Sequence, residues 1–330
     1  MGAAGRYVLA VDSGGTKCDA LLARDDGTIL RWHRVTWSDP ASRSSVVGGG
    51  RSLPAITAAI RQALGDLRCR ELHVAGISHL LDRVLGLCQE HAEIIKAYHM
   101  HEGDPSFAMC GQTHGIVAVA GTGATIQART RDGRSFRLDG LGPYLGDYGG
   151  AFYIGSQAIR AVGKFDWSPR YHTALVEPVF QALGLLNGRP PRTHDLLVYM
   201  IRPPADRAVI ASLARIVDEQ ARASDAVARD ILHDAATAMA ETILCVIEQA
   251  GFLHDGPCPL IGHGSVAQRS AIFWEHLCAR VCAYAPNIVP MLSPFPPVVG
   301  GGLIVLRRLN AVDRDTLWRN LAVSAEKTQP

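Results

Sequence analysis

Two glycine-rich turns occupy matching places in the two halves of the sequence. Residues 12–17 read DSGGTK, residues 121–125 read GTGAT, and each turn joins two apolar segments. Glycine lets the backbone approach a ligand closely, and consecutive N–H groups in such a turn form a nest for an anion. Either turn alone could be a plain hairpin, but two at equivalent places predict a pair that clasps a polyphosphate from both sides. The sequence contains no GxxxxGK[ST] motif, which excludes a nucleotide site of that type.

Two acidic residues stand at the ends of strand-like segments. Asp12 ends the first apolar segment and could hold a hydrated cation. Asp104 precedes Pro105, a pattern typical of a helix N-cap. The same position also suits a general base that takes a proton from a hydroxyl. A carboxylate that caps backbone N–H groups is a poorer base, so the two interpretations of Asp104 compete.

Two further segments are rich in glycine. Residues 140–155 hold six glycines around Asp147, which indicates either a binding loop over a helix N-terminus or a surface loop. Residues 261–265 read IGHGS and predict a turn from a strand into a helix. Gly262 and Gly264 would let a flat ring lie against the backbone there, although an ordinary connection would look similar. We interpret His263 as a loop residue.

The elements that must position these residues follow from the hydrophobic periodicity. Three short strands, separated by a glycine-rich turn and an Asp-Gly turn, occur near the N-terminus and again from residue 115, which predicts two related lobes that each begin with an antiparallel meander. Further strands are expected at 71–78, 94–100 and 258–265. Helices are expected at 52–67, 105–112, 150–163, 171–183, 224–250, 267–283, 297–309 and 313–325. Strands that alternate with helices predict an α/β protein, while residues 166–206 show no clear period.

Length and composition narrow the class of protein. The 330 residues fit two domains, and 33 basic against 31 acidic residues leave a net charge of only +2. Such a balance provides no basic field for nucleic acid or anionic lipid, so neither is expected as a partner. No apolar run is long enough for a membrane span and the N-terminus lacks a signal-peptide pattern, which favours a cytoplasmic protein. Eight cysteines without CxxC or zinc-finger spacing are interpreted as apolar residues in a reducing compartment.

Six motifs in this order resemble the BadF/BadG/BcrA/BcrD ATPase family, and more closely its N-acetylglucosamine kinase branch within the actin/sugar-kinase/heat-shock-chaperone superfamily. The motifs are DSGGTK, the GDP after a strand, AGTGA, GPYLGD, GHGSVAQRS and PFPPVVGGGL, and the resemblance spans residues 7–306. It implies two ribonuclease-H-like lobes, the fold of actin-like ATPases, with ATP and a sugar in an interlobe cleft. We expect the lobes at 1–113 and 114–330, and leave open whether the C-terminal helix packs back on the first lobe.

The same resemblance implies a role for each motif residue. Asp104 matches the catalytic base that deprotonates the sugar 6-hydroxyl, and Asp12 matches the acid near Mg²⁺. The residues matched to ATP come from the three turns and are Gly14, Gly15, Thr16, Lys17, Gly121, Thr122, Gly123, Gly262, Gly264 and Ser265. The residues expected around the sugar are Asp39, Ser78, Thr125, Gly142 and Asp147.

Three departures from the family pattern cluster on the sugar side. Asp39 stands where Asn is expected, Thr125 follows GTGA in place of Asn, and Tyr148 replaces an acid. A carboxylate at position 39 could pair with a free amine, so glucosamine competes with N-acetylglucosamine as the acceptor. We expect an ATP- and Mg²⁺-dependent kinase that phosphorylates a hydroxyl, O6, of an amino sugar and forms a homodimer. A non-catalytic sugar sensor of the same fold and an activator-type ATPase stay as alternatives.

Overall fold

The computed structural model describes residues 3–14, 17–36, 53–186, 188, 190–201, 207–254 and 256–330. The chain divides into two compact units, and the C-terminal segment groups with the N-terminal one. Unit 1 comprises Met1–Thr113 and Ser293–Pro330, and unit 2 comprises His114–Leu292. Each unit is built around one five-stranded mixed sheet.

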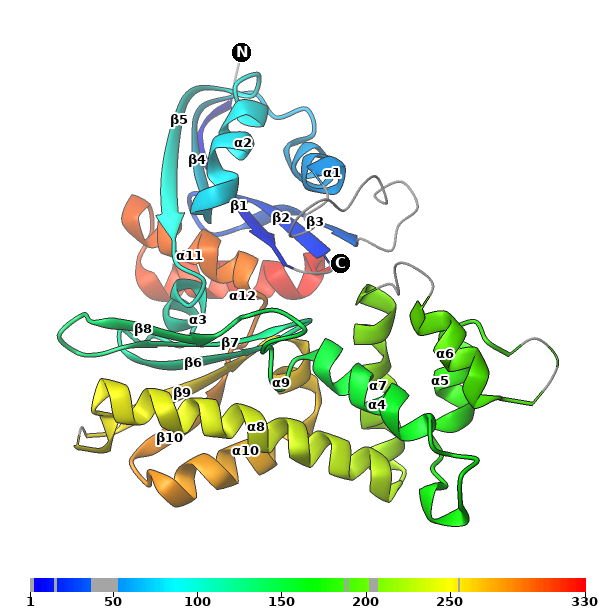
Figure 1. Cartoon of the computed structure of the whole chain (residues 1–330). Helices are drawn as coiled ribbons and strands as arrows, with labels where there is room; N and C mark the ends of the chain where they lie inside the picture. The colour runs from blue at the N-terminus through cyan, green and yellow to red at the C-terminus, as the bar shows by residue number, and fades with distance from the viewer. Residues whose placement is uncertain are drawn as a thin grey trace. The chain divides into compact units, whose positions relative to one another are not determined.

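The sheet of unit 1 has the strand order β3-β2-β1-β4-β5 (Figure 1). Its strands are β1 (Ala3–Ser13), β2 (Lys17–Arg24), β3 (Ile29–Thr36), β4 (Cys69–Ile77) and β5 (Ala92–Met100). The first three strands form an antiparallel meander, and β4 and β5 run parallel to β1. The three parallel strands therefore present their carboxyl ends at one edge of the sheet.

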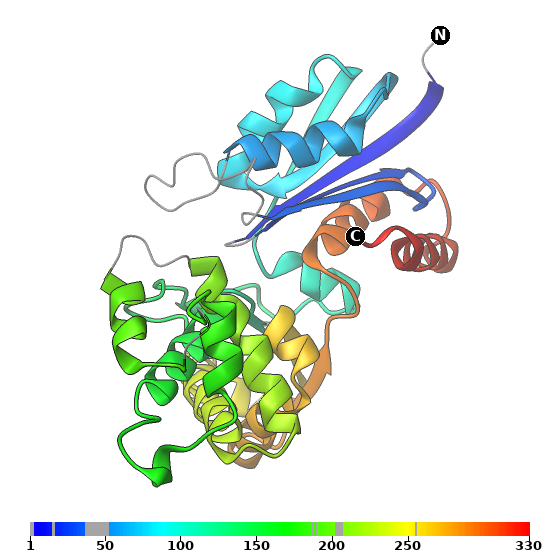
Figure 2. The same cartoon turned by 90° about the vertical axis from the view of Figure 1, so that its right-hand side faces the viewer.

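Helices cover both faces of this sheet, as Figure 2 shows. The helices of unit 1 are α1 (Leu53–Leu64), α2 (Ser78–Cys88), α3 (Asp104–Met109), α11 (Pro297–Leu309) and α12 (Arg314–Thr328). Side chains alternate along β1, so that Leu9 packs with α1 and α2 while Val8 and Ala10 pack with α11 and α12. The C-terminal segment thus completes the core of unit 1.

The sheet of unit 2 repeats the same pattern, with the strand order β10-β9-β6-β7-β8. Its strands are β6 (Gly115–Ala120), β7 (Ala124–Arg129), β8 (Ser135–Asp139), β9 (Cys258–His263) and β10 (Ile288–Leu292). The first three again form an antiparallel meander, and β9 and β10 run parallel to β6. Two sheets of this kind with helices confirm the α/β fold predicted from the alternation of strands and helices.

Most of unit 2 outside the sheet is helical. Its helices are α4 (Ala151–Val162), α5 (Val176–Ala182), α6 (Thr193–Ile201), α7 (Arg207–Arg222), α8 (Ala226–Ala250), α9 (Ser265–Arg269) and α10 (Ala271–Tyr284). The longest, α8, begins where the Asp225 carboxylate accepts the Ala228 N–H and ends at Gly251, whose φ is 79°.

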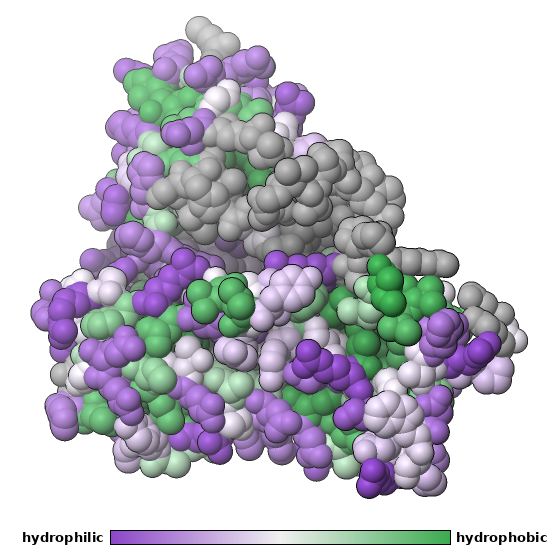
Figure 3. All heavy atoms as spheres, viewed as in Figure 1, coloured by the Kyte–Doolittle hydropathy of each residue, from purple (hydrophilic) through white to green (hydrophobic). Residues whose placement is uncertain are grey.

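Apolar side chains are not all buried in unit 2. Leu197, Met200 and Ile201 of α6 are exposed, and hydrophobic atoms gather over this helix in Figure 3. Among the helices that the structure describes, none combines the length and the apolar character that a membrane crossing needs.

Candidate active site

Three candidate residues of unit 1 lie at or follow the carboxyl ends of its parallel strands. Val11 pairs with Gly76, and Gly76 pairs with His99, so β1, β4 and β5 end almost level. Asp12 lies at the end of β1, Ser78 begins α2 directly after β4, and Asp104 begins α3 shortly after β5. In open α/β sheets this edge is where ligands bind.

Asp104 opens α3 rather than capping it. The N-cap is Gly103, which makes no side-chain capping bond, so the expected N-cap position of Asp104 is wrong by one residue. Its Oδ2 instead accepts the N–H of His101 at 2.9 Å, and the side chain is half-buried. The contact fixes the carboxylate beside the end of β5 without burying it, as a base that must reach a substrate requires.

The helix that carries Asp104 is held closely by the C-terminal segment of unit 1. A Cβ atom at Gly300 of α11 would overlap the backbone carbonyl of Pro105. The absence of a side chain at position 300 therefore lets α11 approach α3 at backbone distance. This packing fixes the position of the backbone next to Asp104.

The structure describes the two ends of the first glycine-rich turn, residues 12–14 and 17. The N–H of Gly14 donates to the carbonyl of Lys17 at 2.9 Å, and the Lys17 side chain is 38% exposed. Gly15 and Thr16 lie outside the described residues, and so does Asp39. The Ser13 hydroxyl is buried and has no hydrogen-bond partner among the residues that the structure describes.

The second turn is tied to the start of α4. The N–H of Gly121 donates to the carbonyl of Gly123 at 3.0 Å, which closes the turn. The N–H groups of Ala151 and Phe152 donate to the carbonyls of Gly121 and Thr122, at 2.8 and 3.0 Å. The carbonyls of the turn therefore point at the helix N-terminus, and the turn itself is half-buried.

Asp147 lies directly against the second turn. It is buried, has a φ of 58°, and places Oδ2 so close to Gly123 that a Cβ there would overlap it. Arg207, at the start of α7, donates from Nη2 to the same oxygen at 3.0 Å. Burial raises the pKa of Asp147 above its usual value, while Arg207 and backbone N–H groups counteract part of that rise.

A second acid shapes the loop that holds Asp147. Asp139, the last residue of β8, accepts the N–H of Asp147 at 2.7 Å and that of Tyr148 at 2.9 Å through its two carboxylate oxygens. Its negative charge also contributes to raising the pKa of Asp147. Sequence reasoning missed Asp139 and Arg207. Asp139 directly precedes the glycine-rich loop, which is a usable signal, whereas nothing in the sequence marks Arg207.

Two expected sugar residues make contacts within unit 2 itself. The buried Thr125 hydroxyl donates to the carbonyl of Leu138 at 3.3 Å and accepts from Arg137 Nε at 3.5 Å. Gly142 has a φ of 85°, and its carbonyl accepts the N–H of Gly146 at 3.0 Å. Both residues therefore build the meander and the loop that surround Asp147.

The third glycine-rich turn lies against the second one. Gly264 has a φ of 96°, and a Cβ there would overlap the carbonyl of Ala120, just before the second turn. At Gly262, an added Cβ would lie 2.6 Å from ring carbons of Trp274. The flat ring that packs on Gly262 is thus the protein's own indole, while Gly264 and Ser265 bring the start of α9 beside the second turn.

Curated relatives of the chain are named as kinases of acetylated amino sugars. An N-acetyl-D-glucosamine kinase of Dictyostelium discoideum is 27% identical over 320 residues, which cover 90% of this chain and 97% of that protein. An N-acetylmuramic acid/N-acetylglucosamine kinase of Clostridium acetobutylicum is 32% identical over 149 residues, 44% of this chain and 47% of that protein.

Solved structures share the fold. A candidate N-acetylglucosamine kinase from Chromobacterium violaceum has a TM-score of 0.61 at 20% identity and covers 91% of this chain and 99% of its own. A ROK family glucokinase from Streptomyces griseus, solved with glucose and AMPPNP, has a TM-score of 0.58 at 15% identity, with coverage of 92% and 99%. At such identities the likeness establishes the actin-like fold of these sugar kinases and nothing finer.

The motifs that suggested a family are matched over nearly the whole chain. The model of the BadF/BadG/BcrA/BcrD ATPase family matches residues 9–305, which include both glycine-rich turns, Asp104, Asp147 and the turn at 261–265. The chain belongs to the BadF/BadG/BcrA/BcrD ATPase family.

Proposed function

We propose that this protein transfers the γ-phosphoryl group of ATP to a hydroxyl, O6, of an amino sugar, with N-acetylglucosamine as the first candidate acceptor. One observation carries the proposal: β1 and β5 end at the same edge of the unit 1 sheet, and Asp12 and Asp104 both lie at that edge. The relative named N-acetyl-D-glucosamine kinase is matched over 97% of that protein's length, which supports the acceptor class.

Asp104 is the proposed general base. A hydroxyl attacks a phosphoryl group better when its proton is accepted by a positioned carboxylate during transfer. The half-buried Asp104 carboxylate, fixed through Oδ2 by the His101 N–H, is suited to that task. Ser78, which follows the neighbouring strand β4, is proposed to lie beside the acceptor.

The glycine-rich turns are the proposed phosphate-binding elements. Unit 1 supplies Gly14, Gly15, Thr16 and Lys17, and unit 2 supplies Gly121, Thr122 and Gly123. The partly exposed ammonium of Lys17 can neutralise phosphate charge, and the glycine backbone permits close approach. Gly264 and Ser265, which lie against the second turn, are proposed to contact the adenosine end of ATP.

Asp12 is the proposed partner of Mg²⁺. Mg²⁺ keeps several waters and is usually bound through one or two carboxylates together with substrate phosphates. Asp12 fits that requirement because its half-buried carboxylate stands next to the first glycine-rich turn. When bound, the ion would neutralise charge that develops on the transferred phosphoryl group.

Asp147 is the proposed contact to the acceptor in unit 2. Its loop is fixed by Asp139 and Arg207, so its carboxylate has one defined position. Thr125 and Gly142 would then act by shaping this loop. Asp39 stays a proposed sugar residue on the basis of its motif, and it is the position at which a free amine would be distinguished from an acetamide.

The setting of the reaction is also proposed. The substrate ATP and the eight cysteines, none of which forms a disulfide among the described residues, suit a reducing cytoplasm. A homodimer is proposed from the family alone. The acceptor is a small molecule, and neither nucleic acid nor a membrane is needed for the chemistry.

A phosphorylation screen tests the function. The purified chain is incubated with ATP and Mg²⁺ and with N-acetylglucosamine, glucosamine, N-acetylmuramic acid, mannosamine, glucose and a cyclitol, and products are identified by mass. We expect N-acetylglucosamine or a close amino-sugar relative to gain one phosphoryl group. If no member gains a phosphoryl group while the chain remains folded and binds ATP, the kinase proposal is wrong.

A further inference from the structure

We propose that Asp19 is a positioning residue that holds the Lys17 ammonium at the first glycine-rich turn, where Lys17 meets the phosphates of ATP. The inference rests on the ATP-binding part of the proposed function. It assigns a role to a buried carboxylate that none of the motifs contains. Asp19 follows Lys17 by two residues on β2, so both side chains lie on the same face of that strand.

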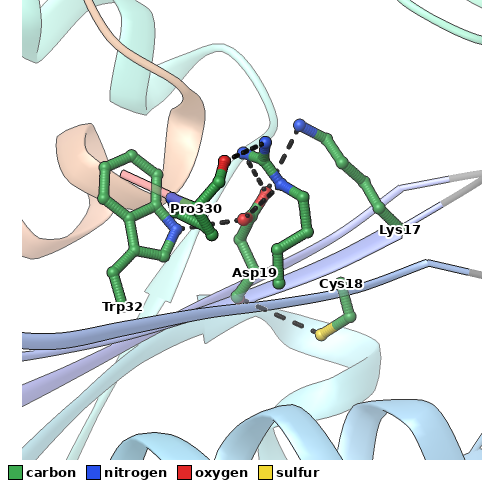
Figure 4. A network of polar contacts seen from close by, with 6 residues as sticks. Lys17, Cys18, Asp19, Trp32 and Pro330 are labelled. Atoms are coloured by element: carbon green, nitrogen blue, oxygen red, sulfur yellow. Dashed lines mark hydrogen bonds and ion pairs between the residues drawn. The ribbon is translucent and has the colours of Figure 1, made fainter. Parts of the chain in front are cut away.

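Four nitrogen atoms converge on the Asp19 carboxylate, which is 0% exposed. Trp32 Nε1 and Arg34 Nε donate to Oδ1 at 3.0 and 2.8 Å, and Arg34 Nη2 donates to Oδ2 at 3.2 Å. The Lys17 Nζ lies 3.4 Å from Oδ2. Figure 4 shows the Lys17 ammonium and the Trp32 indole both directed at this one carboxylate.

Lys17 differs from the other members of this network. The Arg34 side chain is 18% exposed and its third nitrogen, Nη1, donates to the carbonyl of Pro330 at 3.3 Å, so each of its three nitrogens donates to an acceptor within the protein. Lys17 is 38% exposed and carries three N–H donors, of which Asp19 can take one. The ammonium can therefore bind Asp19 and an anion at the same time.

The charges support the same role. A buried carboxylate is costly unless it is paired, and the bidentate Arg34 with Trp32 already satisfies both oxygens of Asp19. Lys17 then adds a second positive charge to a single negative one. Of the two cations that contact Asp19, Lys17 is the more exposed, and its ammonium stands at the turn proposed to hold phosphate.

The network also gives Asp19 a role different from that of Asp12, the proposed magnesium ligand. Asp12 and Asp19 are paired residues of neighbouring strands, so their side chains share one face of the sheet. Two carboxylates at such a pair would repel each other or compete for one cation. The contacts of Asp19 with Trp32, Arg34 and Lys17 occupy its oxygens, which leaves the cation to Asp12.

A double-mutant cycle on ATP binding tests the inference. The dissociation constant for ATP with Mg²⁺ is measured by calorimetry for the wild type, Asp19→Asn, Lys17→Met and the double variant. Asn keeps the shape and an oxygen for Trp32 but removes the charge that holds Lys17. We expect Asp19→Asn and Lys17→Met each to weaken ATP binding roughly tenfold or more. In the Lys17→Met background, Asp19→Asn should change ATP binding by less than about twofold.

Trp32→Phe is the matched control. It removes one donor from the same carboxylate and leaves its charge and Lys17 in place. We expect its ATP affinity to stay within about twofold of the wild type while its midpoint of thermal unfolding falls. If Asp19→Asn does not fold, the cycle is run with Asp19→Glu, which keeps the charge but moves it by one methylene.

Three outcomes would overturn the inference. They are equal loss of ATP affinity from Asp19→Asn in both backgrounds, unchanged ATP affinity in Lys17→Met, and loss in Trp32→Phe as large as that in Asp19→Asn. Because calorimetry needs no acceptor, the cycle reads independently of the phosphorylation screen. Coupling between Asp19 and Lys17 without any phosphorylated sugar would refute the proposed kinase activity alone. Phosphorylation of a sugar without that coupling would refute the role of Asp19 alone.

Discussion

The two glycine-rich turns occur at the same place in two repeated sheets, yet their surroundings differ. In unit 1 the turn ends at Lys17, whose ammonium lies over the buried carboxylate of Asp19. In unit 2 the turn contains no charged residue and is braced by the α4 N-terminus, by the Gly264 turn and by the buried Asp147. The first turn is thus equipped to supply charge, and the second to supply a fixed shape.

If both turns bind phosphate as proposed, this difference divides one task between two copies of a strand-turn-strand element. A phosphate chain needs both neutralised charge and a backbone surface that it can approach. A mutation that removes charge should therefore act mainly in unit 1, and one that adds bulk mainly in unit 2. The proposed base, Asp104, belongs to unit 1, where it follows β5.

The largest effect is expected at Asp104. Asp104→Asn keeps an oxygen for the His101 N–H but cannot accept a proton, so turnover should fall roughly 10²–10⁴-fold with ATP binding intact. Asp147→Asn in unit 2 should instead raise the KM for the acceptor more than it lowers kcat. Steady-state kinetics on both variants checks the contrast, with the exposed neighbour Glu102→Gln as control. Turnover of Asp104→Asn within a few-fold of wild type would remove the base from unit 1.

The shape of the second turn can be tested with two neighbouring glycines. Apart from its chain neighbours, no described residue has an atom within 4 Å of a Cβ placed at Gly121, whereas a Cβ at Gly123 would overlap Asp147. Gly121→Val should fold normally and weaken ATP binding roughly tenfold or more, because the side chain would occupy the phosphate side of the turn. Gly123→Val should lose both ATP binding and about 1–3 kcal/mol of unfolding free energy.

Calorimetry and denaturant unfolding separate these two variants. Gly86→Ala in α2 is the control for a harmless methyl group, because an added Cβ there also meets no atom of the described part of the chain within 4 Å. Undiminished ATP affinity in Gly121→Val would mean that the second turn is an ordinary hairpin.

We expect Arg207→Met to lose stability in a pH-dependent way, because Arg207 pairs with the Asp147 carboxylate. Burial raises the pKa of Asp147, so the folded state favours the protonated acid and loses stability as pH rises through that pKa. Arg207 offsets part of this loss, and its removal should cost about 1–2 kcal/mol at neutral pH, since the guanidinium is half-exposed. The deficit should shrink towards zero at about pH 4, near the ordinary pKa of a carboxylic acid.

Denaturant unfolding at both pH values measures the effect. Arg215→Met on the same helix breaks only an exposed pair with Glu219 and should cost about 0.3–0.5 kcal/mol. A deficit in Arg207→Met that is the same at both pH values would show that Arg207 does not act on the charge of Asp147.

The smallest effect is expected at Ser13, the second residue of the first turn. Its buried hydroxyl has no partner among the described residues, so Ser13→Ala removes an unsatisfied group and should leave stability unchanged or raise it by up to about 1 kcal/mol. Chemical denaturation of both proteins provides the comparison. A loss of stability in Ser13→Ala would mean that the hydroxyl supports the turn after all.

Local signals in the sequence were sufficient for the repeated meanders and several helices. The Asp-Gly turns led to the two meanders, β1–β3 and β6–β8, and the apolar periods led to α8 and α11 close to their observed bounds. The helix expected at 267–283 is divided instead at Ser270, whose hydroxyl accepts the Phe273 N–H and starts a new helix. A serine N-cap inside an apolar period is difficult to distinguish from a helical residue by periodicity alone.

Other elements depend on packing rather than on local pattern. β10 was not predicted because Pro290 lies inside it, and proline is tolerated there only because β10 is an edge strand. α7 follows the stretch without a clear period, and its first residue, Arg207, gains its role only by meeting Asp147 sixty residues away in sequence. The identity of motif residues could be predicted, whereas the residues that brace them, Asp19, Asp139 and Arg207, require the fold.

The central claim is transfer of the terminal phosphoryl group of ATP to a sugar hydroxyl, and isotopic labelling tests it most directly. The protein is incubated with N-acetylglucosamine, Mg²⁺ and ATP labelled in the γ-phosphoryl group, and the labelled product is identified by mass and its position by NMR. The account predicts label on O6 of the sugar, formed by the wild type and lost in Asp104→Asn. Label found only in inorganic phosphate, at a rate that the sugar does not change, would contradict it.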